Sequence, residues 1–286
     1  MTVDKLSLGK FTIYGIRDGY FYLDGGAMFG VVPKVLWEKI YTPDDQNRIK
    51  MGLNSLLIQT ESDLILVETG IGPGLDPGFS KYYSVERKPG LEEEIRCLGF
   101  EPQNIDFVIN THLHFDHCGG NTFQTEKGRW VPSFPKSRYI IQKGEWEYAL
   151  RPCYRDKTSY MRNNFIPLEE HGCLSLVEGD AEIADGVEVL LAPGHTSHHQ
   201  CVKISSKDGT VFFLGDMVPM SAHVGLSYIM SYDLYPLETL ANKKKYFERA
   251  LSEDWVVAFV HDAELFFGRI MKKDRKYFLK PLKNPA

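Results

Sequence analysis

A chain of 286 residues, 43% of them hydrophobic, is long enough to bury the core of one large domain. Its formal net charge of −5 offers no basic field for a nucleic acid, and no apolar stretch reaches the roughly 18 residues of a membrane-spanning helix. Residues 1–10 lack the apolar core of a secretion signal, so we expect a cytoplasmic protein. Five cysteines without a C-x-x-C pair argue against a disulfide framework.

The periodicity of the chain predicts an α/β protein. Short apolar or alternating runs predict strands at 11–16, 53–60, 63–68, 105–109, 187–191, 211–214 and 256–260. Helical periodicity is expected at 90–99 and 235–250. The strand patterns fall into two groups, before residue 142 and after residue 186, which indicates two sheets covered by helices within a single domain, 1–286.

Residues 143–175 lie between the two groups of strands, and we expect them to form a helical cap insertion. The insertion mixes aromatic residues with arginines, so its aromatics either pack onto the body of the protein or cover a site. His171 lies within it, and His198 and His199 follow a later loop; we expect each of them at the surface or as a support of a metal ligand. The lysine run 243–245 is expected on a solvated helix face.

Residues 111–120 read THLHFDHCGG and contain the core His-x-His-x-Asp-His. From the frequencies of His and Asp in this chain, that core arises by chance on the order of once in two thousand such sequences. In an extended segment His112 and His114 point the same way and can share one ion, whereas Asp116 and His117 follow at the start of a helix and can serve a second. The motif therefore predicts part of two metal sites. Cys118 adjoins it, and we expect that side chain to be packed in the core.

Three further candidate ligands each follow a predicted strand. His195 lies in Pro193-Gly194-His195, Asp216 follows Gly215, and His261 precedes Asp262. Loops at the ends of strands in a rigid scaffold commonly carry catalytic groups. These placements support a common site with residues 112–117.

In this order, the motifs resemble those of the metallo-β-lactamase superfamily, over residues 53 to 262. The resemblance implies an αββα four-layer sandwich, with two mixed β-sheets flanked by helices and metals at one edge. It implies seven ligands: His112, His114 and His195 for one ion, Asp116, His117 and His261 for the other, and Asp216 bridging them. One motif differs from the family pattern, because Glu68-Thr69-Gly70 stands where the family usually has Asp-Thr-Gly. Whether the longer Glu68 side chain supports the metal ligands is left open.

Within the superfamily, the segment 24–34 and Trp37 resemble the branch of quorum-quenching lactonases. This resemblance implies that Met28 and Phe29 contact the substrate. On composition alone, the segment is either an apolar lip of a pocket or a loop packed into the core. Some lactonases of this superfamily carry an oxyanion-stabilising tyrosine three residues after the bridging aspartate. Here Pro219 occupies that position, and His223 is our first candidate for a catalytic donor in its place.

The resemblance implies a dinuclear hydrolase that opens lactone rings, with N-acyl homoserine lactones as the expected substrates. The nitrogen and carboxylate ligands favour two Zn²⁺ ions, although manganese, iron or cobalt would also suit them. A hydroxide bridging the ions would attack the carbonyl, and Asp116 would transfer the proton to the leaving group. The alternatives are a phosphotriesterase or arylesterase, and a non-catalytic metal-binding sensor. We expect a small lactone or ester as partner, no nucleic acid and no membrane, and the resemblance allows a homodimer.

Overall fold

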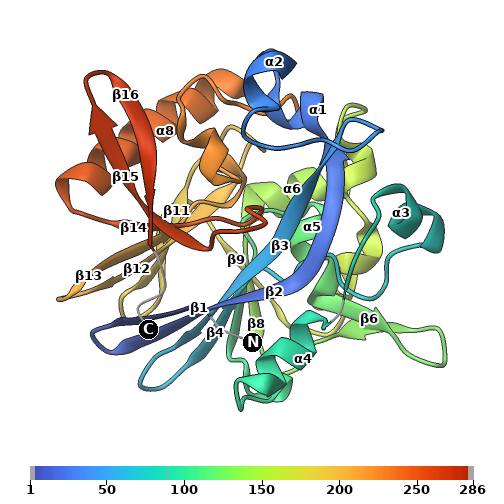
Figure 1. Cartoon of the computed structure of the whole chain (residues 1–286). Coiled ribbons are helices and arrows are strands. Elements are labelled where there is room, and N and C mark those ends of the chain that lie inside the picture. Colours follow the sequence, from blue (N-terminus) through green and yellow to red (C-terminus); the bar gives the residue numbers. More distant parts are fainter. Residues whose placement is uncertain (1–3, 88, 283–286) are drawn as a thin grey trace.

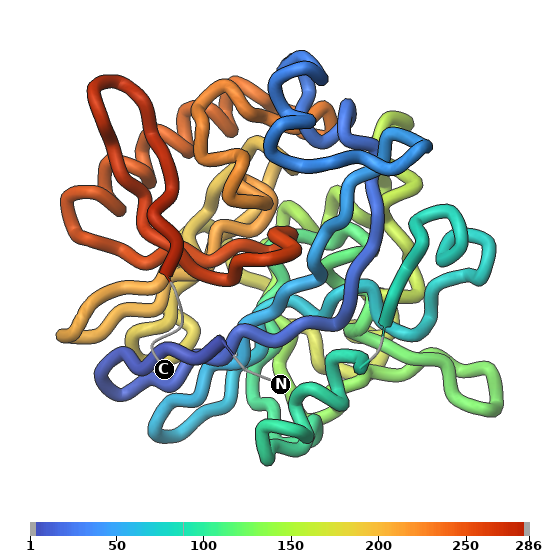
Figure 2. Tube along the Cα trace, viewed as in Figure 1, coloured from blue at the N-terminus to red at the C-terminus, as the bar shows by residue number. Residues whose placement is uncertain are grey.

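The computed structural model describes residues 4–87 and 89–282, and two large mixed sheets dominate it (Figures 1 and 2). The first sheet has the strand order β1 (Asp4–Leu8), β2 (Phe11–Asp24), β3 (Arg48–Gln59), β4 (Leu64–Val67), β5 (Phe107–Ile109), β8 (Arg138–Gln142), β9 (Leu174–Val177). The second has the order β10 (Ala181–Ala184), β11 (Val187–Leu191), β12 (Gln200–Ser206), β13 (Gly209–Phe213), β14 (Val256–Ala258), β15 (Phe267–Lys273), β16 (Lys276–Pro281). A small hairpin joins β6 (Thr122–Gln124) to β7 (Trp130–Pro132).

Helices cover the outer faces of the two sheets and surround the loops at their edge. They are α1 (Gly25–Phe29), α2 (Lys34–Trp37), α3 (Pro77–Tyr82), α4 (Leu91–Cys97), α5 (Phe115–Cys118), α6 (Lys143–Leu150), α7 (Ile166–Glu170) and α8 (Pro236–Ser252). The apolar faces of α4, α6 and α7 pack on the first sheet, and that of α8 packs on the second. Among the described residues, no helix is long and apolar enough to cross a membrane.

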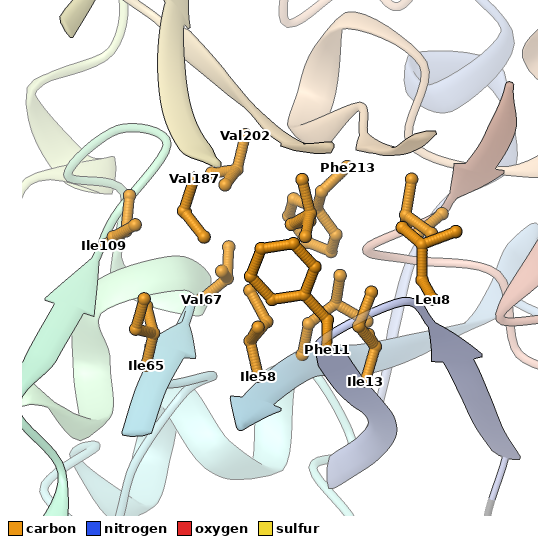
Figure 3. Packing of buried hydrophobic residues seen from close by; sticks show 14 of the residues in the cluster. Leu8, Phe11, Ile13, Ile58, Ile65, Val67, Ile109, Val187, Val202 and Phe213 are labelled. Atoms are coloured by element: carbon orange, nitrogen blue, oxygen red, sulfur yellow. The ribbon is translucent and has the colours of Figure 1, made fainter. Parts of the chain in front are cut away.

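The core between the two sheets is built from aliphatic and aromatic side chains. Figure 3 shows Phe11, Ile58 and Val67 of the first sheet directed toward Val202 and Phe213 of the second, and all five are at most 1% exposed. Fully burying one such side chain stabilises the fold by about 1.5–3 kcal/mol. Helices outside and sheets inside give the four layers of the predicted αββα sandwich, which is confirmed.

Strand β2 continues eight residues beyond the predicted strand at 11–16. The sequence pattern ends there because Arg17 and Asp18 resemble exposed residues, but the structure buries Asp18 completely. Its carboxylate pairs with Arg87 and accepts hydrogen bonds from the backbone N–H groups of Ile71 and Gly72. A bulge in the pairing with β3 lies between Arg17 and Gly19, and the strand then continues along β3.

The insertion at 143–175 contains α6, two 3₁₀ turns and α7, and its last two residues belong to strand β9. Trp146 and Phe165 are buried against the first sheet, so the packing alternative describes these aromatics. Four of its residues, Arg155, Asp156, Thr158 and Ser159, instead line a pocket described below. The insertion therefore both packs its aromatics onto the body of the protein and contributes residues to the pocket, the two alternatives that the sequence left open.

One surface prediction is wrong. Lys244 and Lys245 are exposed, but the Lys243 side chain is 0% exposed and its ammonium donates hydrogen bonds to three backbone carbonyls. The lysine run of the sequence does not reveal this, because the burial comes from a loop that folds over α8.

The sheet topology brings the strand ends together. β13 and β14 are parallel, and β11 runs in the same direction because β12 is antiparallel to both β11 and β13. The loops that follow β11, β13 and β14 therefore leave the second sheet at one edge. They carry His195, Asp216 and His261, and the loop that follows β5 in the first sheet reaches the same place with residues 111–118.

Candidate metal centre

The structure brings all seven candidate ligands together in three overlapping groups. Within each group, one ligand atom from every side chain lies within 4.8 Å of the others, and all of these residues are buried. The groups are His112–His114–His195, Asp116–His117–His261, and His112–His117–Asp216. The first two groups match the two expected ligand triads, and Asp216 connects them.

In the first group, Nδ1 of His114 lies 3.1 Å from Nε2 of His195. The Nδ1 atom of His112 lies 2.9 Å from the hydroxyl of Thr111, while its buried Nε2 has no hydrogen-bond partner. A buried nitrogen without a partner is costly in a folded protein. A cation that accepts these nitrogen lone pairs removes that cost.

In the second group, the Nε2 atoms of His117 and His261 also lie 3.1 Å apart. The carboxylate of Asp116 approaches both rings, with Oδ2 3.5 Å from Nε2 of His261 and 3.8 Å from Nε2 of His117. Asp116 and His117 lie on the short helix α5, and His114 just before it is extended, as the sequence predicts. This change of backbone conformation directs the two halves of the motif to different groups.

Asp216 lies between the two groups. Its Oδ2 is 3.2 Å from Nε2 of His195 and 3.5 Å from Nε2 of His117, and its Oδ1 is 3.3 Å from Nε2 of His261. Tetrahedral Zn²⁺ with bonds of about 2.0–2.2 Å holds neighbouring ligand atoms about 3.3–3.6 Å apart. The spacing and the chemistry of the donors therefore fit two divalent ions of this kind.

The electrostatics of the centre favour cation binding. Burial, reinforced by neighbouring imidazoles, lowers the pKa of His112 and His114 well below the usual value, so both rings are neutral and can donate lone pairs. Burial opposes ionisation of Asp216, but the surrounding histidines, His117 foremost, lower its pKa well below normal. Burial also disfavours a charged His117, yet the carboxylates of Asp216 and Asp116 raise its pKa, and a bound metal displaces such a proton.

The far sides of two rings are held by hydrogen-bond acceptors. Nδ1 of His195 lies 3.0 Å from Oδ1 of Asp233, and Nδ1 of His261 lies 2.8 Å from the carbonyl of Gly52. Such partners fix the tautomer of a metal-ligating imidazole. The sequence did not identify Asp233, because it belongs to no motif and lies in a loop.

Glu68 fills the position left open by the sequence. One of its carboxylate oxygens lies 3.4 Å from Nδ1 of His117 and accepts a hydrogen bond of 3.0 Å from the backbone N–H of Thr111. The residue has a φ of 64°, a left-handed conformation that is strained for a side chain other than glycine. The longer side chain therefore still supports the metal loop.

Glu145 on α6 connects three segments around the first group. Its Oε1 accepts hydrogen bonds from the backbone N–H of Leu113 and the hydroxyl of Tyr160, and its Oε2 accepts one from the hydroxyl of Thr196. The Tyr160 ring packs edge-on against His114 with 4.8 Å between ring centroids. Burial raises the pKa of Glu145, and these three donors oppose that rise.

The other histidines have different surroundings. His199 is buried and its Nε2 accepts a hydrogen bond from the backbone N–H of Asp216. Gly215 permits this approach, since its φ of 51° is left-handed and an added Cβ would lie 2.5 Å from that nitrogen. Nδ1 of His198 lies 2.9 Å from the Ser197 hydroxyl, and His171 is exposed. Cys118 is buried in the core, as expected.

A pocket of about 340 Å³ opens over the metal centre. Its polar floor includes His114, Asp116, His195, Asp216 and His261. The walls combine apolar, aromatic and polar side chains: Leu23, Met28, Tyr83, Phe115, Arg155, Asp156, Thr158, Ser159, Met230, Ser231 and Tyr232. Arg155 of the insertion donates a hydrogen bond to the carbonyl of Ser231, and the N–H of Ser231 donates to the carbonyl of Ala27, so three separate segments meet at one wall.

Two of the predicted site residues lie away from the pocket surface. Phe29 is completely buried, stacked between Trp37 and His223 at centroid distances of 5.2 and 5.0 Å. His223 is also buried, with Nε2 2.8 Å from the carbonyl of Met28, and burial lowers its pKa to about 4. Met28 reaches the pocket wall, whereas Phe29 and His223 pack behind it.

Comparisons with known proteins agree with this architecture. A model of the metallo-β-lactamase superfamily matches residues 50–261. The N-acyl homoserine lactonase AiiA of Bacillus thuringiensis subsp. kurstaki is 28% identical over 218 residues, which cover 73% of this chain and 80% of that protein.

Two solved structures extend the likeness over most of the chain. A structure described as a probable metal-dependent hydrolase from Staphylococcus aureus has a TM-score of 0.88 at 28% identity, covering 97% of this chain and 100% of that chain. An N-acyl homoserine lactone hydrolase with the product N-hexanoyl-L-homoserine bound at its catalytic metal centre has a TM-score of 0.67 at 26% identity, covering 92% and 95%. Since the family model spans most of its length, the chain belongs to the metallo-β-lactamase superfamily.

Proposed function

We propose that this protein is a dinuclear zinc hydrolase that opens the ring of N-acyl homoserine lactones. The observation that carries the proposal is the convergence of five histidines and two aspartates in two triads with Asp216 between them, where three of the histidines and both aspartates line the floor of the pocket. The names of the relatives, an N-acyl homoserine lactonase and an N-acyl homoserine lactone hydrolase, support the choice of substrate.

Two bound Zn²⁺ ions would supply a water with its pKa lowered toward about 7 and would polarise the lactone carbonyl. The surrounding residues would transfer a proton and orient the ligand rings. Asp116 is 9% exposed and lines the pocket, so its carboxylate can take a proton and return it to the leaving alcohol. Asp233 and the carbonyl of Gly52 hold the rings of His195 and His261 in one orientation.

The walls of the pocket suit a small ring that bears an acyl chain. Leu23, Met28 and Met230 supply apolar surface for the chain, and several polar groups lie among them. Two tyrosines, Tyr83 and Tyr232, also line the pocket and can donate to an oxyanion. Burial, together with the nearby Asp116 carboxylate, raises the pKa of Tyr83 to about 12, so its hydroxyl keeps its proton at neutral pH. We therefore propose that Tyr83, rather than His223, supplies the oxyanion donor that is missing at Pro219.

A panel of substrates tests the proposal. Purified zinc-loaded protein is assayed for proton release from hexanoyl- and decanoyl-homoserine lactone, and for hydrolysis of paraoxon, an aryl ester and a thioester. We expect the lactones to be opened with the highest kcat/KM. Faster turnover of paraoxon or the aryl ester would instead establish the phosphotriesterase or arylesterase alternative. Zinc-loaded protein without turnover of any member would refute the proposal.

A further inference from the structure

We propose that Lys243 is a positioning residue, which holds the loop of residues 221–233 in the conformation that forms one wall of the substrate pocket. The proposal concerns a buried cation outside the metal centre. Among the described residues, Lys243 is the one buried lysine, and its side chain is 0% exposed. Lysine side chains are rarely buried to this extent unless their charge is compensated.

Backbone carbonyls compensate this charge. Nζ of Lys243 donates hydrogen bonds to the carbonyls of His223, Gly225 and Tyr228, at 2.7, 2.8 and 2.8 Å. An ammonium group has three N–H donors and no acceptor, so these three contacts use all of them. All three carbonyls belong to one loop, and a single side chain therefore fixes its path at three points.

A second residue on the same face of α8 anchors the end of the loop. Thr239 lies four residues before Lys243, one helical turn away, and its hydroxyl donates a hydrogen bond of 2.7 Å to Oδ2 of Asp233. The other oxygen of Asp233 contacts His195 of the metal centre. Thr239 therefore supports the metal centre, whereas Lys243 supports the preceding part of the loop.

The segment held by Lys243 leads directly to the pocket. Immediately after Tyr228, residues 230–232 line the pocket, and the N–H of Ser231 donates to the carbonyl of Ala27 at 2.8 Å. The Tyr228 ring packs edge-on against Phe29, with 6.1 Å between centroids. Loss of the lysine contacts removes the ammonium donor from all three carbonyls, of which that of Gly225 keeps the N–H of Tyr228, and the wall formed by Met230 and Tyr232 then loses its fixed position.

This role predicts a specific change in kinetics. A displaced wall weakens substrate binding but leaves the metal ligands and Asp233 in place. We therefore expect KM to rise by about tenfold in Lys243→Met, with kcat and zinc content within about threefold of wild type. This kinetic readout rests on the proposed function. Hydrogen–deuterium exchange of the backbone amides in residues 221–233 is independent of it.

The experiment compares Lys243→Met with Lys243→Gln and with Lys244→Met, whose original side chain is exposed. Hydrogen–deuterium exchange measured by mass spectrometry should show residues 221–233 exchanging about tenfold faster in Lys243→Met, with the rest of the chain unchanged. Lys243→Gln keeps two N–H donors and should lie between Lys243→Met and wild type. Lys244→Met should behave as wild type in both exchange and kinetics.

Two results would overturn the proposal. One is wild-type exchange and wild-type KM in Lys243→Met. The other is faster exchange throughout the chain with a parallel loss of kcat, which would mean a general contribution to folding. If Lys243→Met does not fold, Lys243→Gln decides by the same two readouts. If wild-type protein opens no lactone, the proposed substrate is wrong, and the local exchange still decides the role of Lys243.

Discussion

Replacing Asp233 with Ala should weaken zinc binding without removing a ligand. Asp233 and His195 are 4% and 3% exposed, and 3.0 Å separates Oδ1 from Nδ1. The alanine leaves the buried Nδ1–H of His195 without an acceptor, and the ring loses the contact that fixes its orientation. Removal of such a partner typically costs 10–100-fold in metal affinity, or about 1.4–2.7 kcal/mol.

The conservative variant Asp233→Asn separates hydrogen bonding from charge. The Asn carbonyl can still accept from Nδ1 of His195, and its amide can donate to the Thr239 hydroxyl, so we expect the loss in affinity to stay below about tenfold. Competition between the protein and a chromophoric zinc chelator measures both variants against wild type. Wild-type zinc affinity in Asp233→Ala would refute the reasoning, because the hydrogen bond would then contribute nothing to the centre.

Three further perturbations test the core, the buried lysine and the pocket. Phe213→Ala removes a side chain that is 0% exposed between the sheets and should lower the free energy of unfolding by about 3–5 kcal/mol in urea titrations, whereas Phe278→Ala, at a residue 46% exposed, should cost far less. Burial lowers the pKa of Lys243 to about 7, with Asp233 opposing that shift and the buried His223 ring nearby. The ammonium with its three hydrogen bonds therefore predominates below about pH 7. Between about pH 7 and 10 the folded side chain loses its proton while the unfolded chain keeps it, so wild-type stability should rise relative to Lys243→Met by up to about 1.4 kcal/mol per pH unit. Parallel pH profiles of unfolding for these two proteins would contradict that assignment. Tyr83→Phe should lower kcat for lactone opening by about 10²-fold with little change in KM if its hydroxyl stabilises the oxyanion, and an unchanged kcat would exclude this role.

The residue patterns predicted two sheets covered by helices and a common site for the candidate ligands, and the resemblance to the superfamily implied the four-layer sandwich and the assignment of the seven ligands. The common site could be predicted because each ligand of the second sheet directly follows a strand. His195, Asp216 and His261 come after β11, β13 and β14, whose ends the topology places at one edge. The alternation of His112 and His114 before a short helix was likewise readable from their spacing.

The residues that the sequence did not reveal depend on contacts between distant segments. Asp233 contacts His195 with one carboxylate oxygen and Thr239 of α8 with the other, and no local pattern marks these contacts. Lys243 belongs to a run of three lysines and is buried only because the loop before α8 folds over it. Local periodicity does not contain these arrangements.

The substrate contacts were the least predictable part of the site. The segment of residues 24–34 was compatible with both a pocket lip and a packed loop, and the structure divides it: Met28 lines the pocket and Phe29 is buried behind it. His223 was the first candidate for the donor missing at Pro219, but its ring is buried and stacks on Phe29. Neighbouring residues of an irregular loop point in directions that only the folded backbone determines.

The most direct test of the central claim is zinc stoichiometry measured together with lactone opening on the same preparation. We predict two zinc ions per chain by elemental analysis, loss of hexanoyl-homoserine lactone opening on chelation, and its return when zinc is added back. His114→Ala and Asp216→Ala should stay folded and lose turnover. Full lactone opening by protein stripped of metal, or by both variants, would contradict the account.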